Sequence, residues 1–125
     1  MGACMALLSI VLFTGGKAEA APQCGKASWY STEDGFNTAS GDRLSPAGMT
    51  AAHRTLPFGT NVRVDNLANG RSVVVRINDR GPFVGGRVID VNKAAAQILG
   101  LISSGVARVK LTVLDGAAAL SGNGC

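Results

Sequence analysis

The stretch TNVRVDNLANGRSVVVRIND, residues 60–79, has the pattern of a β-hairpin. Val62 and Val64 alternate with charged residues, which places apolar side chains on one face of a first strand. The pair Asn69-Gly70 is a strong short-range signal for a tight hairpin turn. The apolar run after this turn therefore predicts a return strand that pairs with the first.

Alternating segments and turns continue on both sides of this hairpin. Asn92 is the candidate N-cap of a helix, and Gly100 is its candidate stop. Several short strands, one helix and many turns favour a small β-barrel. We expect strands over residues 25–31, 60–66, 71–79, 87–91 and 105–115, a short apolar segment over 49–60 that Pro57 and Gly59 break, and the helix over 92–100.

Residues 1–20 have the features of a secretory signal peptide, because the short apolar run CMALLSIVLF is followed by small residues. The run is too short to span a bilayer, which needs roughly 20 apolar residues. We therefore expect an exported, soluble protein, periplasmic or secreted, and the absence of a lipobox predicts no stable membrane anchor. The remaining chain divides into a domain over 21–116 and a flexible tail over 117–125.

The charge balance gives no support to nucleic acid as a partner. The net charge of +4 is a mild basic bias, and the arginines are spread over several predicted strands. No stripe of interleaved aromatic and basic residues of the single-strand-binding kind is present. The bias favours an acidic polymer, such as a bacterial wall.

Removal of the signal peptide leaves two cysteines, Cys24 and Cys125, at the two ends of the mature chain. In an exported protein an even pair indicates a disulfide. A bond that closes a loop of this size stabilises a fold by roughly 4–5 kcal/mol in the chain-entropy model. The alternative is two free thiols at the chain ends.

The return strand of the hairpin ends on an acidic residue. Val75 and Ile77 share a face because side chains alternate along a strand, and a regular strand would place Asp79 on the same apolar face. Arg76 and Arg80 flank this carboxyl group. A turn residue before Gly-Pro and a catalytic carboxylate are both compatible with this position.

Several classes of chemistry are excluded by what the sequence lacks. One histidine and two distant mature cysteines give no zinc-ligand spacing, and no phosphate loop or dinucleotide fingerprint is present. We therefore expect no metal and no cofactor. Acid–base chemistry remains, with Asp79, His53 and Asp42 as candidates. Glycosidic bond cleavage is one such reaction, because it needs a proton donor at the leaving oxygen.

Each candidate also has a structural explanation. Trp29, Tyr30 and Phe83 offer flat faces for sugar rings, but core packing is the better explanation for the first two. A hydrogen bond within a turn explains His53, and a solvated loop explains Asp42.

Four segments together resemble the RlpA-like (rare lipoprotein A-like) family. They span residues from about 25 to 114, and they are ASWYS, TASGD, MTAAHRTLPFGTNVRVDNLANGRSVVVRINDRGPF and GRVIDVNKAAAQILG. The resemblance implies a six-stranded double-psi β-barrel with one or two short helices. It also implies lytic transglycosylase activity on the glycan strands of bacterial peptidoglycan, by a protein that we expect to be a monomer.

The resemblance assigns roles to individual residues. Asp79 matches the family's catalytic acid, and His53 matches its active-site histidine. Asp42 stands where the family usually has a glutamate, so its carboxyl group sits about an ångström farther back. A displacement of this size costs on the order of 100-fold in rate when the group touches the reacting centre. The side chains expected to bind substrate are Arg80, Arg76, Asn78, Trp29, Tyr30 and Phe83.

Two other functions remain open on the same barrel. One is an inverting glycoside hydrolase, with Asp42 as base for a water molecule and Asp79 as acid. The other is a non-catalytic, expansin-like module that binds glycan and loosens the wall.

Overall fold

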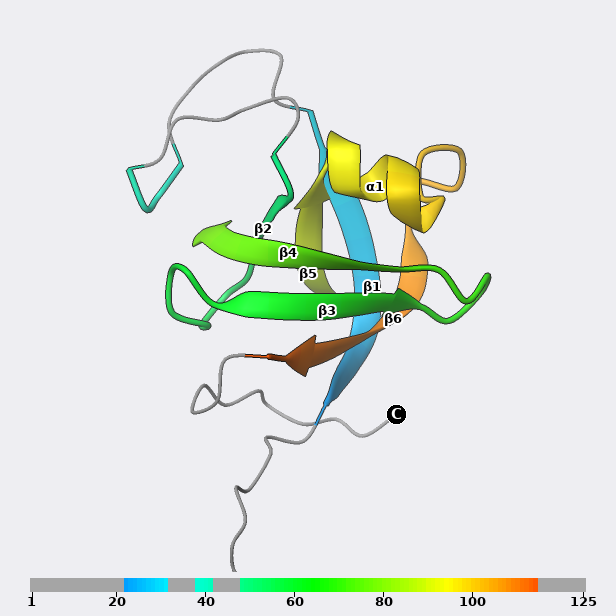
Figure 1. Cartoon of the computed structure of the whole chain (residues 1–125), viewed down its shortest axis with the longest axis horizontal. Coiled ribbons are helices and arrows are strands. Elements are labelled where there is room, and N and C mark those ends of the chain that lie inside the picture. The colour runs from blue at the N-terminus through cyan, green and yellow to red at the C-terminus, as the bar shows by residue number, and fades with distance from the viewer. Residues whose placement is uncertain (1–21, 32–37, 42–47, 115–125) are drawn as a thin grey trace, which may run out of the picture.

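The computed structural model describes residues 22–31, 38–41 and 48–114. Six strands and one short helix lie within these ranges (Figure 1). In chain order they are β1 (Gln23–Tyr30), β2 (Thr50–Ala52), β3 (Asn61–Asn66), β4 (Ser72–Asp79), β5 (Arg87–Asn92), α1 (Lys93–Leu99) and β6 (Ala107–Val113). The predicted segments are confirmed with shifts of one or two residues at most ends, and the segment over 49–60 contains the short strand β2.

The six strands close into a barrel in the order β1-β5-β2-β4-β3-β6. The pairs β1–β5 and β2–β4 are parallel, whereas β2–β5, β3–β4, β1–β6 and β3–β6 are antiparallel. Both parallel pairs join strands that are not consecutive in sequence, so each pair requires a crossover connection. This arrangement confirms the double-psi β-barrel that the resemblance predicts.

The predicted hairpin is the antiparallel pair β3–β4. Its turn is closed by hydrogen bonds from the Asn66 amide to the Arg71 carbonyl at 2.7 Å and from the Gly70 amide to the Asn66 carbonyl at 2.8 Å. The side chain of Asn66 adds a bond from its Nδ2 to the Leu99 carbonyl at 2.9 Å. The hairpin turn is therefore tied to the end of helix α1.

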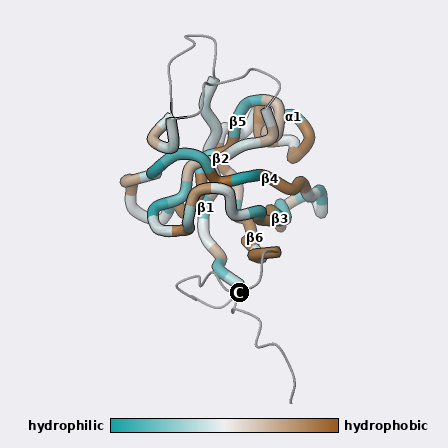
Figure 2. The backbone as a smooth tube through the Cα atoms, turned by 60° about the vertical axis from the view of Figure 1, so that its left-hand side comes forward, coloured by the Kyte–Doolittle hydropathy of each residue, from teal (hydrophilic) through white to brown (hydrophobic). Residues whose placement is uncertain are grey.

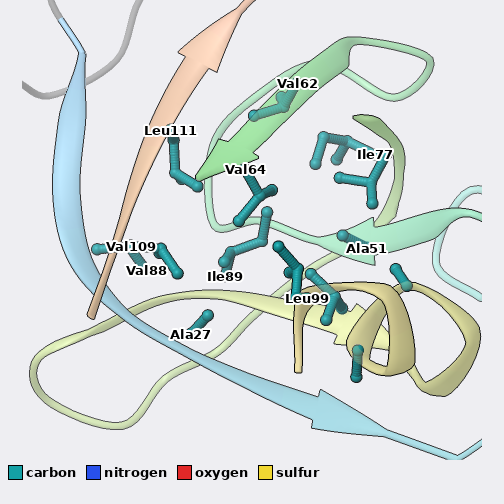
Figure 3. Close-up of a cluster of buried hydrophobic side chains, with 14 of the residues drawn as sticks. Ala27, Ala51, Val62, Val64, Ile77, Val88, Ile89, Leu99, Val109 and Leu111 are labelled. Carbon is teal, nitrogen blue, oxygen red and sulfur yellow. The ribbon is translucent and has the colours of Figure 1, made fainter. Parts of the chain in front are cut away.

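The core lies inside the barrel, where apolar residues from the strands meet those of α1 (Figure 3). Hydrophilic and hydrophobic stretches alternate along the backbone (Figure 2), as the strand pattern predicts. Val62 and Val64 are fully buried, whereas Arg63 between them is exposed. The buried core comprises Ala27, Ala51, Leu56, Val62, Val64, Val75, Ile77, Val88, Ile89, Val91, Ala95, Ala96, Leu99, Leu101, Val109 and Leu111.

Helix α1 begins and ends where the sequence predicts, with Asn92 confirmed in the N-cap position. The side chain of Asn92 makes no capping hydrogen bond to the helix. Its Nδ2 instead donates to the carbonyl of Gly48 at 2.8 Å, because Asn92 also belongs to the buried end of β5. Gly100 ends the helix in the left-handed conformation, with a φ of 76°.

Several predictions concern residues outside the described ranges, and these stay predictions. They include the signal peptide over 1–20, the tail over 117–125 and the carboxyl group of Asp42. Cys24 is buried and disulfide-bonded, and its partner cysteine lies outside the described residues. Pairing with Cys125 therefore stays a prediction. Within the described part of the chain, no helix has the length and apolar character that a membrane span requires.

Candidate active site

Asp79 is the last residue of β4, and a β-bulge sets the direction of its side chain. On the neighbouring strand β2, Ala51 pairs with Ile77 but Ala52 pairs with Asp79, so Asn78 has no counterpart. Adjacent residues of β2 point to opposite faces, which places Asp79 on the face opposite Ile77. The expected continuation of the apolar face is therefore wrong: Asp79 is half-buried on the outer face of the barrel.

One oxygen of the Asp79 carboxyl group is fully engaged by the backbone. Its Oδ1 accepts hydrogen bonds from the amide of Ala39 at 3.0 Å and from the amide of Arg80 at 2.9 Å. Among the described residues no hydrogen bond reaches Oδ2. Because Oδ1 accepts from two fixed N–H donors, a proton on this carboxyl group resides on Oδ2, which is then oriented as a donor.

The turn after Asp79 holds this geometry. Gly81 has a φ of 123°, a conformation that residues with a side chain rarely adopt, and the Gly81–Pro82 peptide is cis. Phe83 follows with 78% of its surface exposed. Its exposure is compatible with the predicted role as a flat surface for a sugar ring.

The segment 38–41 is attached to the end of β4. The amide of Ser40 donates to the carbonyl of Asn78 at 3.2 Å, next to the bond from Ala39 to Asp79. The hydroxyls of Thr38 and Ser40 are 2.9 Å apart. The segment therefore forms part of the surroundings of Asp79. Asp42, the residue after it, lies outside the described residues, and its role stays a prediction.

His53 is buried beneath the site, with 3% of its surface exposed. Its Nδ1 accepts hydrogen bonds from the amides of Thr55 at 3.1 Å and Leu56 at 3.2 Å. The ring proton must then be on Nε2, which donates to Oε1 of Gln23 at 3.0 Å. The amide of His53 also donates to the carbonyl of Asp79 at 3.1 Å. Both ring nitrogens are thus hydrogen-bonded to neighbouring residues, and the amide of His53 holds the backbone of Asp79 in place.

Burial, together with the nearby charges of Arg54 and Arg80, lowers the pKa of His53 to about 4. The folded protein therefore keeps this ring neutral at pH values where an unfolded histidine, with a pKa near 6.5, takes up a proton.

This difference predicts a loss of stability in acid. As the pH falls from about 6.5 to about 4, the unfolded state gains a proton that folded His53 does not, so the free energy of unfolding decreases by up to about 3 kcal/mol. Denaturant titrations at pH 7.5 and pH 4.5 measure the change, and it should be smaller in a variant without His53. An equal decrease in both proteins would contradict the assignment.

Arg80 contacts the loop after His53 and makes no ion pair with Asp79. Its Nη1 donates to the carbonyls of His53 at 3.2 Å and Leu56 at 2.8 Å, and its guanidinium lies 4.0 Å from the centroid of the Phe58 ring. Within the described part of the chain, the one ion pair joins Arg63 and Asp65. The guanidinium of Arg80 therefore holds the loop after His53 against the turn after β4.

The other residues predicted to bind substrate occupy different surroundings. Asn78 is 2% exposed, and its Oδ1 has no hydrogen-bond partner among the described residues. Trp29 packs against the core, as the structural explanation for it predicts. Arg76 is exposed on β4 and pairs with Thr50 of β2. Tyr30 is half-buried, and its hydroxyl lies 3.3 Å from the Thr50 Oγ1.

Three polar residues on the strands β1, β5 and β2 were not identified from the sequence. Asp90 of β5 pairs with Ala52 on one side and with Ser28 of β1 on the other, and the Ser28 hydroxyl donates to its Oδ1. Thr50 contacts the hydroxyl of Tyr30. The only sequence signal for Asp90 was its polarity within the mostly apolar strand RVIDV. Its position near Asp79 depends on the strand order, which cannot be predicted from neighbouring residues along the chain.

Comparisons with known proteins agree with this fold. A family described as lytic transglycolase matches residues 22–111. The chain is 63% identical over 93 residues to the probable endolytic peptidoglycan transglycosylase RlpA of Nostoc sp., covering 72% of this chain and 25% of that protein. It is 54% identical over 90 residues to the endolytic peptidoglycan transglycosylase RlpA of Neisseria meningitidis, covering 71% of this chain and 38% of that protein.

Two solved structures share the fold at low sequence identity. An expansin from Clavibacter michiganensis has a TM-score of 0.59 at 22% identity, covering 77% of this chain and 52% of that chain. A papain inhibitor from Streptomyces has a TM-score of 0.62 at 22% identity, covering 79% of this chain and 99% of that chain. The chain spans between a quarter and two fifths of the length of the two RlpA proteins above. Because the family match extends over most of the chain, this chain belongs to the RlpA-like lytic transglycolase family.

Proposed function

We propose that this domain is an endolytic peptidoglycan lytic transglycosylase. It cleaves the β-1,4 bond between N-acetylmuramic acid and N-acetylglucosamine and leaves a 1,6-anhydro end. The observation that carries the proposal is the carboxyl group of Asp79, whose Oδ1 is held by two backbone amides at 2.9 and 3.0 Å. Family membership supplies the substrate class.

The reaction needs a single acid that later acts as a base. Asp79 donates the proton on Oδ2 to the glycosidic oxygen, and the bond from that oxygen to C1 of the muramyl residue breaks. The 6-hydroxyl of the same residue then attacks C1, and its proton passes to the Asp79 carboxylate. No water is consumed, and the acid is restored for the next cleavage.

The residues around Asp79 have supporting roles in this proposal. His53 is a positioning residue, because its ring is buried and its amide bonds the carbonyl of Asp79 at 3.1 Å. Arg80 holds Phe58 and the loop beside the site, and Phe83 offers an exposed ring to a sugar. Asp42 assists in orienting the glycan, in the position where the family usually has a longer acid.

The location and state of the protein follow from the same proposal. A wall enzyme acts outside the cytoplasm, which agrees with the predicted signal peptide over residues 1–20. We expect a monomer, periplasmic or secreted, without a stable membrane anchor.

A glycan-binding module without catalysis is the second candidate. The expansin fold supports it, since one solved structure with this fold is an expansin mutant in complex with cellohexaose. The replacement of the family's usual glutamate by Asp42 also favours this candidate, because a shorter acid reaches less far.

Product analysis on purified sacculi tests the proposal. Wild-type protein should release fragments with 1,6-anhydro ends. Reducing ends would instead indicate a hydrolase, and binding to sacculi without cleavage would indicate the binding module. Asp65→Asn is a suitable control, because it removes a carboxylate of an exposed ion pair on β3 and should leave the products unchanged.

A further inference from the structure

A second carboxyl group lies in the same row of the sheet as Asp79. Ala52 of β2 pairs with Asp79 of β4 on one side and with Asp90 of β5 on the other. Directly paired residues point to the same face of a sheet. Ile89 and Val91, the neighbours of Asp90 in β5, are fully buried, so Asp90 faces outward together with Asp79.

Ala52 is buried, with 5% of its surface exposed, and its side chain adds only a methyl group between the two acids. Neighbouring strands lie about 4.8 Å apart, so the Cα atoms of Asp79 and Asp90 are about 10 Å apart across β2. In glycosidases the two carboxyl groups that act on one sugar ring stand roughly 5–9.5 Å apart, a separation that side chains on Cα atoms at this distance can reach. The two acids are therefore close enough for both to act on one sugar residue.

Asp90 is held in place by β1. The Ser28 hydroxyl, in a residue with only 7% of its surface exposed, donates to Oδ1 of Asp90. Tyr30, two residues farther along β1, lies near both acids: burial raises the pKa of its phenol, and the charges of Asp79 and Asp90 raise it further. The two carboxyl groups thus share one electrostatic environment.

The stereochemistry of the reaction requires more than a proton donor. The bond that breaks and the bond to O6 that forms both lie on the β face of the muramyl C1. A single in-line displacement cannot retain this configuration, so positive charge must develop at C1 and be stabilised from the opposite face. The 2-acetamido group of the sugar can supply that stabilisation when its N–H is held by a carboxylate.

We propose that Asp90 is the second catalytic carboxylate, which binds the acetamido N–H of the muramyl residue and stabilises the cation formed at C1. The inference rests on the proposed transglycosylase function. Asp79 gives its proton to the departing oxygen, and that oxygen keeps the electron pair of the broken bond. The acetamido oxygen donates an electron pair to C1 from the α face. The oxazolinium ion that results keeps its N–H hydrogen-bonded to the carboxylate of Asp90. O6 then displaces the acetamido oxygen, and its proton returns to Asp79.

A stable mimic of this ion gives the sharpest test. The 2-methylthiazoline of muramic acid has the shape and the polarity of the oxazolinium ion, so a site that stabilises the ion binds it tightly. Calorimetry with the wild type, Asp90→Asn, Asp79→Asn and Asp65→Asn should show affinity reduced about 10–100-fold only in Asp90→Asn. Ser28→Ala should weaken binding about 10-fold, because Asp90 loses the donor that orients it.

Cleavage rates separate this role from a structural one. Asp90→Asn should reduce kcat about 100-fold on ordinary glycan strands, with KM little changed. On strands whose muramyl residues lack the N-acetyl group, the wild type and Asp90→Asn should cleave at nearly equal low rates, because the group through which Asp90 acts is gone.

The outcomes distinguish the inference from the function on which it rests. If the wild type releases anhydro ends and Asp90→Asn matches it in thiazoline affinity and rate, Asp90 is not catalytic although the transglycosylase assignment stands. If Asp90→Asn is slow by the same factor on acetylated and deacetylated strands, its role is structural and the inference is overturned. A wild type that neither cleaves sacculi nor binds the thiazoline would overturn both proposals.

Discussion

Asp79→Asn should reduce the release of anhydro-ended fragments by about 10²–10⁴-fold and leave the barrel folded. The amide oxygen of asparagine can accept the same hydrogen bonds from Ala39 and Arg80 that Oδ1 accepts now. The amide nitrogen takes the place of Oδ2, and it cannot deliver an acidic proton. The change therefore removes the proposed chemistry and little else.

The measurement is fragment release from sacculi at matched concentrations of folded protein. Co-sedimentation with sacculi should be unchanged in Asp79→Asn, since glycan binding does not need the proton. Asp65→Asn provides the matched control for loss of a carboxylate elsewhere on the barrel. Wild-type rates in Asp79→Asn would exclude Asp79 as the acid and leave it as a turn residue.

His53→Ala should lower the free energy of unfolding by about 2–4 kcal/mol. The change leaves the amides of Thr55 and Leu56 without the acceptor Nδ1, and it leaves the Oε1 of Gln23 without a donor. Cleavage should fall as well, because the amide of His53 holds the carbonyl of Asp79 and the loop around it loosens.

Denaturant unfolding monitored by the fluorescence of Trp29, the single tryptophan, measures the stability. The decrease in wild-type stability between pH 6.5 and pH 4 should also be smaller in His53→Ala, since the contribution of this histidine is gone. A variant as stable as the wild type but without cleavage would argue that His53 acts directly on the substrate. His53→Gln can serve as a milder comparison, because its amide can replace one of the lost hydrogen bonds.

The sequence was most informative where structure depends on neighbours along the chain. The alternation around Val62 and Val64, the turn at Asn69-Gly70 and the stop at Gly100 all have local physical causes, and each is confirmed. The alternation argument failed at Asp79 because a bulge at Asn78 shifts the pairing of β4 with β2, and no local pattern signals that shift. The predicted N-cap position of Asn92 is confirmed, but its side chain makes no capping bond and its Nδ2 instead bonds Gly48 in a distant segment, which no local pattern signals.

The four segments that resemble the RlpA-like family, RINDRGPF among them, determined the family and singled out Asp79 as the candidate acid, because these depend on residue identity and spacing along the chain. Only the tertiary structure decided which groups surround that acid. The parallel pairing of β2 with β4 and the antiparallel pairing of β2 with β5 bring Asp90 into the same row as Asp79. The loop after β2 binds Nδ1 of His53, and Gln23 of β1 binds its Nε2. The order of the strands and the hydrogen-bond partners of buried side chains are set when segments far apart in sequence close one barrel around one core. The periodicity within a single strand does not predict either of them.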